Sequence, residues 1–188
     1  MRKQLEAVIS QALQNHETTL GTVERNTEIK VVYLTLWALG WDPIQDIACN
    51  FHIPRNKFQG DRVKMAKAVD FAVRDSSGGI SLLGEVKQCS VKAKKWEKGI
   101  EQIQIYQKAI KAPRVFLTSG FRWLILDEYG KKLADIQNAA NGGRLIDQLT
   151  PYLMKGNVPF GATEPGDWNY GISPPSLRKQ SKRDAQKD

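Results

Sequence analysis

Three charged residues lie in segments that otherwise predict a buried β-hairpin. Asp70 belongs to the apolar run at 68–74, and Glu85 and Lys87 belong to the run at 79–88. Side chains alternate between the two faces of a strand, so Glu85 and Lys87 share one face. Two carboxylates on neighbouring strands repel one another unless a cation lies between them, and Mg²⁺ binds carboxylate oxygens while keeping several of its waters. The spacing therefore favours a metal site in which Lys87 orients, or helps to deprotonate, a water molecule.

The turn of the hairpin determines how close the two acids come. If the Asp-Ser-Ser-Gly-Gly segment forms the loop, Arg74 pairs with Ile80. Counting back along both strands then places Asp70 opposite Gly84, one residue from Glu85, on strands spaced roughly 5 Å apart. A bulge at Gly84 would bring the two acids directly opposite one another.

An alternative needs no metal, because Lys87 can form a salt bridge with either acid on a solvent-facing strand. Two features favour the catalytic interpretation: the three residues fall in strands rather than loops, and basic segments flank the hairpin on both sides. Lysines and arginines around a metal site are what a phosphodiester substrate requires. The candidate nucleic-acid-binding residues are Arg55, Lys57, Arg62 and Lys64 before the hairpin, and Lys92, Lys94, Lys95 and Lys98 after it.

The rest of the chain predicts the elements that must hold this hairpin. Apolar residues recur at helical spacing in four places, and shorter apolar runs between turn residues indicate further strands. Both hairpins are antiparallel, so the sheet is not parallel throughout. We therefore predict an α/β domain with a mixed central β-sheet flanked by α-helices. The expected helices span 2–15, 26–39, 95–110 and 144–155, and the further strands span 113–120 and the hairpin 121–136, with a short strand within 44–54 and a basic loop at 55–67.

The overall composition indicates one domain and an anionic partner. The chain has 188 residues and a formal net charge of +8, which favours nucleic acid first and a membrane surface second. We expect the folded domain to span 1–154. Residues 155–188 form a Pro- and Gly-rich extension with a basic tail, and the tail from residue 176 is predicted to be disordered because it lacks apolar periodicity.

The cysteines and the N-terminal segment bear on the cellular compartment. Cys49 and Cys89 form no Cys-x-x-Cys pair, and we expect two buried free thiols, which fits a reducing compartment. Glu6 interrupts the apolar stretch that a signal peptide needs. The longest apolar run is about half the length of a membrane-spanning helix. The protein is therefore expected to be cytoplasmic, with no membrane partner.

Taken in order along the chain, these residues resemble a known superfamily. Asp70 followed by "GEVK", with Glu85 and Lys87, resembles the motif of the PD-(D/E)xK nucleases. The segment "EQIQIYQ" offers Gln102 and Tyr106, similar to the QxxxY motif that follows the third strand in a subset of those nucleases. The Asp and Glu-x-Lys pattern is weak by itself, whereas the ordered series of motifs is considerably more specific.

Two further segments resemble the N-terminal nuclease domain of type I restriction enzyme R subunits. "VFLTSGFRWLIL" is similar to their strand–turn–strand segment, and Glu28, on the helix that ends in "LGWD", matches an acidic residue that they carry on an early helix. The resemblance covers about residues 24–136. Without it, Glu28 reads as a first-turn glutamate two residues after an N-capping Asn26, and Tyr106 and Trp123 read as core residues.

The resemblance implies a restriction-endonuclease-like fold and a Mg²⁺-dependent DNA endonuclease, with Mn²⁺ as another suitable metal. In such a site Asp70 and Glu85 would hold the metal, helped by the Val86 carbonyl, and Lys87 would position the attacking water. The early-helix glutamate would complete the acidic cluster, while the QxxxY pair would support the site or contact DNA. The catalytic residues that the resemblance implies are Asp70, Glu85, Lys87, Glu28, Gln102 and Tyr106.

The chain also departs from the family pattern. Val69 replaces the Pro that usually precedes the Asp, and no GxxxxGK[ST] nucleotide-binding loop occurs. The ATP-driven motor of an R subunit is therefore missing. The chain is expected to act on DNA in one of three ways: by itself, as a homodimer, or with a separate motor or specificity subunit. The alternative functions are a non-catalytic DNA-binding or regulatory module on the same fold and, third, an RNA nuclease. The intact Asp/Glu/Lys set favours the enzyme.

Overall fold

The protein was analysed as a computed structural model, which describes residues 1–20, 23–53, 57 and 68–161. Its centre is one six-stranded sheet in which the strands lie side by side in their order along the chain. All neighbouring strands are antiparallel except the third and fourth, which are parallel. The strands are β1 (Ile47–Phe51), β2 (Val69–Arg74), β3 (Ile80–Val86), β4 (Arg114–Thr118), β5 (Trp123–Asp127) and β6 (Lys132–Ile136).

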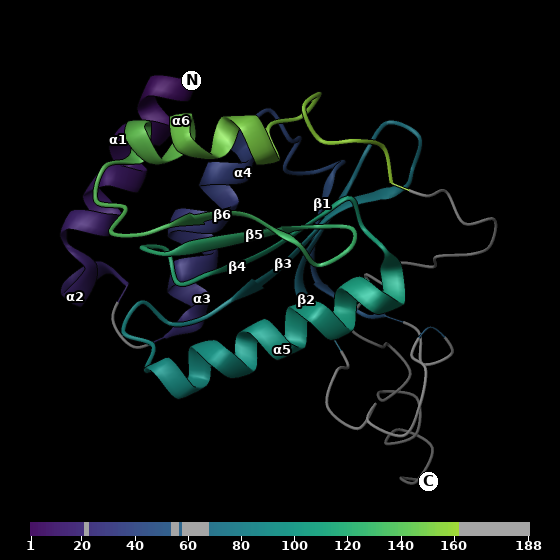
Figure 1. Cartoon of the computed structure of the whole chain (residues 1–188). Helices are drawn as coiled ribbons and strands as arrows, with labels where there is room; N and C mark the ends of the chain where they lie inside the picture. Colours follow the sequence, from purple (N-terminus) through teal and green to yellow (C-terminus); the bar gives the residue numbers. More distant parts are fainter. Residues whose placement is uncertain (21–22, 54–56, 58–67, 162–188) are drawn as a thin grey trace, which may run out of the picture.

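Helices cover both faces of this sheet, as Figure 1 shows. The long helix α5 forms the crossover between the two parallel strands and packs on one face, and the N-terminal helices and α6 pack on the other. The predicted α/β class with a mixed sheet is therefore confirmed. The helical segments are α1 (Arg2–Gln14), α2 (His16–Thr19), α3 (Glu24–Thr27), the π-helical segment η1 (Glu28–Tyr33), α4 (Leu34–Ala38), α5 (Ala93–Ile110) and α6 (Gly142–Leu153).

Two apolar cores result, one on each side of the sheet, because side chains alternate along the strands. Phe71, Phe116 and Trp123 belong to the core beneath the N-terminal helices and α6. Leu83 and Leu117 belong to the core beneath α5. The sequence-based expectation that Trp123 is a core residue is confirmed, since its side chain is fully buried.

The β2–β3 hairpin departs from the predicted register. Its loop is the predicted one, but beyond the loop β3 carries one extra residue, Ser81, and the pairing shifts by one. Phe71 consequently pairs with Gly84, and the next residue along β2, Asp70, comes across from Glu85. The prediction that Asp70 lies opposite Gly84 is therefore wrong, because the bulge forms near the turn and not at Gly84.

Two other expectations require correction. The helix predicted at 26–39 begins earlier, with Val23 as its N-cap, so Asn26 lies inside the helix and its side-chain amide donates to the Leu20 carbonyl. Neither cysteine is fully buried: Cys49, on the edge strand β1, is exposed, and Cys89, after β3, is half-buried. Within the described ranges no helix is both long and apolar enough to cross a bilayer.

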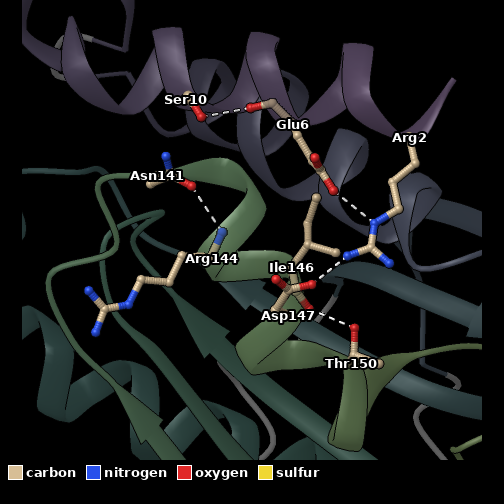
Figure 2. Close-up of polar contacts among 8 residues, drawn as sticks. All are labelled: Arg2, Glu6, Ser10, Asn141, Arg144, Ile146, Asp147 and Thr150. Atoms are coloured by element: carbon tan, nitrogen blue, oxygen red, sulfur yellow. Dashed lines mark hydrogen bonds and ion pairs between the residues drawn. The ribbon is translucent and has the colours of Figure 1, made fainter.

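The ends of the described chain are held by polar contacts. Helix α6 packs beside α1, and Figure 2 shows Arg2 reaching both Glu6 and Asp147, at 2.8 and 2.5 Å. After α6, the segment 155–161 runs to the hairpin turn, where the Gly161 N–H donates to Asp75 Oδ2 at 2.7 Å. The division at residue 154 stays a prediction, and the predicted disordered tail lies outside the described residues.

Candidate active site

The Asp70, Glu85 and Lys87 side chains lie at the end of the hairpin away from its turn. Glu85 and Lys87 are only 5% and 9% exposed, and Lys87 Nζ lies 2.5 Å from Glu85 Oε1. The Val86 N–H donates to Asp70 Oδ2 at 2.7 Å, which ties β2 to the end of β3. The strand is therefore not solvent-facing, and the interpretation of these residues as a solvated surface pair is wrong.

Gly84 is required where the acid-bearing end of β3 passes β4. A Cβ atom at this position would overlap the ring of Phe116, which fills the space on the opposite core side. The ring therefore supports the backbone directly beneath Glu85. The "GEVK" sequence combines a steric requirement at its first residue with charged side chains on the other face of the strand.

Burial makes the two carboxylates difficult to ionise together. It raises the pKa of Asp70 to about 7, with the nearby charge of Glu85 adding to the increase and the Val86 N–H opposing it. Burial also raises the pKa of Glu85, although the Lys87 ammonium acts in the opposite direction. A single lysine does not offset one buried and one half-buried carboxylate, so a further cation would stabilise the ionised pair.

One atom of this pair has an unused bonding capacity. Glu85 Oε2 is buried, and no donor meets it in good hydrogen-bond geometry, while its other oxygen contacts Lys87. The Tyr106 hydroxyl lies near enough to lower the pKa of Glu85, but it donates its hydrogen to the Ala68 carbonyl. A buried carboxylate oxygen normally has a donor or a metal ion beside it. The described residues contain no group of three or more Asp, Glu, His or Cys side chains arranged to hold a metal. Two carboxylates nevertheless fit Mg²⁺, which retains several of its water ligands.

Glu28 lies close to this pair on the helix that packs at the same end of the sheet. It is the first residue of η1, is 9% exposed, and receives Arg25 Nη1 at 2.6 Å. Its negative charge contributes to the raised pKa of Asp70. The first-turn interpretation based on Asn26 fails with the corrected helix start. Segments of π-helix often occur at functional sites because they displace side chains from regular helical positions.

Glu24 and Arg25 are neighbours of the site that sequence reasoning missed. The charge of Glu24 contributes to the raised pKa of Glu85, which places Glu24 beside the hairpin end. The signal that would have found it is its spacing: Glu24 precedes Glu28 by four residues and therefore shares its helix face.

The two α5 residues predicted from the QxxxY resemblance differ in burial. Tyr106 is buried, and its hydroxyl donates to the Ala68 carbonyl at 3.0 Å, just before β2 begins. Burial and the charges of Glu85 and Asp70 raise the pKa of Tyr106. Gln102 is half-buried beside Tyr106. The core and site interpretations of Tyr106 are thus compatible, because its ring fills the core while its hydroxyl lies near the acids.

The candidate DNA-binding lysines gather at the start of α5. Lys92 is its N-cap, and Lys94, Lys95 and Lys98 are exposed on its first turns. The first turn contains no acidic residue, so these lysines add to the positive end of the helix dipole. Lys57 is partly exposed, whereas Arg55, Arg62 and Lys64 lie outside the described residues.

The comparisons with known proteins concern the fold. No protein-family model matches the chain, and no curated protein matches it. A solved DrdV–DNA complex contains a chain that is 12% identical with a TM-score of 0.51, over 78% of this chain and 13% of the DrdV chain. A fragment described as an HsdR subunit of a type I restriction enzyme from Vibrio vulnificus YJ016 is 18% identical with a TM-score of 0.47.

The HsdR fragment match covers 68% of this chain and 25% of the other. This chain therefore spans about a quarter of the HsdR fragment and about an eighth of the DrdV chain. At these identities the likeness concerns the fold alone. The mixed sheet with α5 on one face and the remaining helices on the other has the predicted restriction-endonuclease-like fold.

Proposed function

We propose that the chain is a Mg²⁺-dependent DNA endonuclease domain that hydrolyses phosphodiester bonds, with a role in restriction, defence or repair. The observation that carries the proposal is the close Asp70–Glu85 pair, in which the pKa of half-buried Asp70 is raised and buried Glu85 has one oxygen that is not held by Lys87. A cation in addition to Lys87 would stabilise such a pair, and Mg²⁺ or Mn²⁺ has the required charge and oxygen preference.

In this proposal each site residue has a separate role that follows from its position. Asp70 and Glu85 hold the metal with the Val86 carbonyl, and the bound metal supplies charge for the phosphate and lowers the pKa of a water. Lys87, whose ammonium contacts the Glu85 carboxylate, orients the attacking water. Glu28 contributes further negative charge from the π-helical segment.

The two α5 residues have supporting roles in the same proposal. The Tyr106 hydroxyl holds the start of β2, and therefore Asp70, against α5. Gln102, half-buried beside Tyr106, orients that hydroxyl or reaches a DNA phosphate from the same helix face. These contacts would position the acids without binding the metal themselves.

The start of α5 is the proposed path of the DNA backbone. Lys92, Lys94, Lys95 and Lys98 would displace counterions from phosphates, which gives salt-dependent affinity. The DrdV structure is a complex with DNA, and the shared fold makes DNA the favoured partner over RNA. We propose that the domain acts as a homodimer or with a motor or specificity subunit, in the cytoplasm.

A non-catalytic DNA-binding module is the second candidate. It is favoured by one observation, the 2.5 Å contact of Lys87 with Glu85, which already neutralises one acid without a metal. The two functions differ in what Mg²⁺ should do. A nuclease requires the metal for strand cleavage, whereas a binding module retains DNA with its strands intact.

The deciding experiment incubates the purified protein with supercoiled plasmid, with Mg²⁺ or with a chelator, beside the Asp70→Asn variant. We expect nicked plasmid only for the wild type with Mg²⁺. Calorimetric titration with Mg²⁺ gives a second readout, with heat for the wild type and none for the variant. Metal-independent nicking, or equal nicking by both proteins, would contradict the proposed site. DNA binding without nicking would support the binding module.

A further inference from the structure

Helix α5 approaches the sheet so closely at Gly99 that a side chain there would force neighbouring side chains to move. A Cβ atom at Gly99 would lie 2.8 Å from Leu117 Cδ1, 3.1 Å from Leu117 Cδ2 and 3.2 Å from Lys87 Cε. Real Cβ atoms are not found at the first of these distances. Glycine weakens a helix interior relative to alanine, so its presence in the middle of an 18-residue helix has a packing reason.

The contact with Lys87 differs from the contact with Leu117 in its consequence. Leu117 is an apolar core residue that pairs with Glu85 across β3 and β4 and has no charged group of its own. Lys87 Nζ contacts Glu85 Oε1 at 2.5 Å, and its backbone N–H donates to the Thr118 carbonyl at 2.7 Å. Its backbone and its ammonium are therefore both held, and the stem between them lies against the Gly99 backbone. A lysine side chain has many rotamers, and contact with the Gly99 backbone reduces the number that Lys87 can adopt.

We propose that Gly99 is a positioning residue for Lys87. The bare helix backbone at Gly99 lets the lysine stem pass and keeps its ammonium on Glu85. This inference rests on the proposed function, in which Lys87 orients the attacking water. A methyl group at position 99 would displace Lys87 Cε by a few tenths of an ångström and move the ammonium with it. Catalytic rates are sensitive to displacements of this kind, since a misplacement of about 1 Å can lower a rate by about a hundredfold.

The first test is Gly99→Ala, assayed for plasmid nicking and for DNA affinity. We expect the nicking rate to fall by about threefold to tenfold, with the Kd for DNA unchanged, because Gly99 is buried against the sheet whereas the DNA-binding lysines of α5 are exposed. Gly143→Ala in α6 is the matched control. Its Cβ would meet no atom closer than 3.4 Å, and it should nick at the wild-type rate. Wild-type nicking by Gly99→Ala would overturn the proposal.

A second pair of variants separates positioning from packing. Leu117→Val removes both Cδ atoms and with them the two shortest contacts that an alanine at position 99 would make. In this background Gly99→Ala should lower the melting temperature less than it does in the wild type. The nicking rate should still fall, because the clash with Lys87 Cε remains. A rate that recovers together with the melting temperature would show that Gly99 acts through packing alone.

A third measurement does not depend on activity. A double-mutant cycle compares the unfolding free energy of Gly99→Ala, Lys87→Ala and the double variant with the wild type. Because Lys87→Ala removes Cε, Gly99→Ala should destabilise that background less. Additive effects would overturn the Gly99–Lys87 contact. Coupling in a wild-type protein that does not nick DNA would instead overturn the proposed function and leave the contact established.

Discussion

The α1–α6 junction and the β2–β3 site are two polar clusters with opposite designs. At the junction Arg2 lies between Glu6 and Asp147, and all three side chains are at least partly exposed (Figure 2). At the site Glu85 is buried and Asp70 is half-buried, and the ammonium of Lys87 contacts Glu85 alone of the two acids. Opposite charges in water contribute little to stability, whereas like charges in a buried place are unfavourable. The difference identifies the hairpin end as the place where the fold accepts an electrostatic cost.

The largest expected effect comes from removing a site charge without changing shape. Glu85→Gln should lower the nicking rate by about a thousandfold or more, since a metal contributes several kcal/mol of charge stabilisation. Asp147→Asn, which removes a carboxylate from the α1–α6 junction, is the control and should nick normally. The measurement is the initial rate of plasmid nicking. Comparable losses in both variants would mean that the two clusters do not differ in function.

The second-largest expected difference between the β2–β3 site and the α1–α6 junction is in how pH changes the free energy of unfolding. An unfolded Asp ionises near its ordinary pKa of 3.8, while folded Asp70 ionises near 7, so between these values the folded state binds more protons. Its contribution to stability is therefore fully present below about pH 4 and is lost as the pH rises through 7. The loss is at most about 4 kcal/mol, at roughly 1.4 kcal/mol per unit.

Thermal unfolding between pH 4 and 8 measures this loss. Asp70→Asn should flatten the profile and melt higher than the wild type at pH 8, and saturating Mg²⁺ should stabilise the wild type more at pH 8 than at pH 5. Asp147→Asn should leave the profile unchanged. A wild-type profile identical to that of Asp70→Asn would show that Asp70 ionises normally in the folded protein.

A moderate effect is expected from the lysines at the start of α5. Replacing Lys94, Lys95 and Lys98 with Gln should weaken binding to any DNA duplex and lower the salt slope by about one for each phosphate that the variant no longer neutralises. Fluorescence anisotropy at several salt concentrations measures both quantities. Lys3→Gln, a single lysine on α1, is the control. An unchanged salt slope in the triple variant would place the DNA elsewhere.

The smallest effect is expected at the α1–α6 junction. Arg2→Ala should lower the unfolding free energy by at most about 1 kcal/mol, because half-exposed ion pairs are screened by water. The difference should shrink with added salt. Denaturant unfolding at low and high salt measures it. A loss of several kcal/mol would mean that the junction is a principal stabilising contact and that the contrast between the clusters is weaker than their burial indicates.

Sequence patterns predicted the hairpin, α5 and the β4–β6 segments because apolar periodicity reports which face of an element is buried. The loop composition located the turn, but nothing in it reported the extra residue at Ser81, since a bulge depends on contacts across strands. The π-helical start at Glu28 was missed for a similar reason, because one added residue per turn hardly changes an apolar pattern.

Site residues could be predicted from the sequence where a charged side chain stands in a segment that is otherwise apolar. Asp70, Glu85 and Lys87 were noticeable as charges within apolar runs, and the structure brings them together. Glu24 was not noticeable, because a glutamate in the first turn of a helix is ordinary. Gly99 was missed because its role depends on the distance between α5 and the sheet, which only packing determines.

The order of the sheet has a consequence for how the chain folds. All five pairs of adjacent strands in the sheet are also consecutive in the sequence. The parallel β3–β4 pair is the one that requires a crossover connection. Local hairpins form before long connections close, so Asp70 and Glu85 meet early, before α5 covers them and before any metal is held. Their repulsion then acts on the folding barrier. Stopped-flow refolding of the wild type should be faster at pH 5 than at pH 8, and Asp70→Asn should refold at equal rates at both.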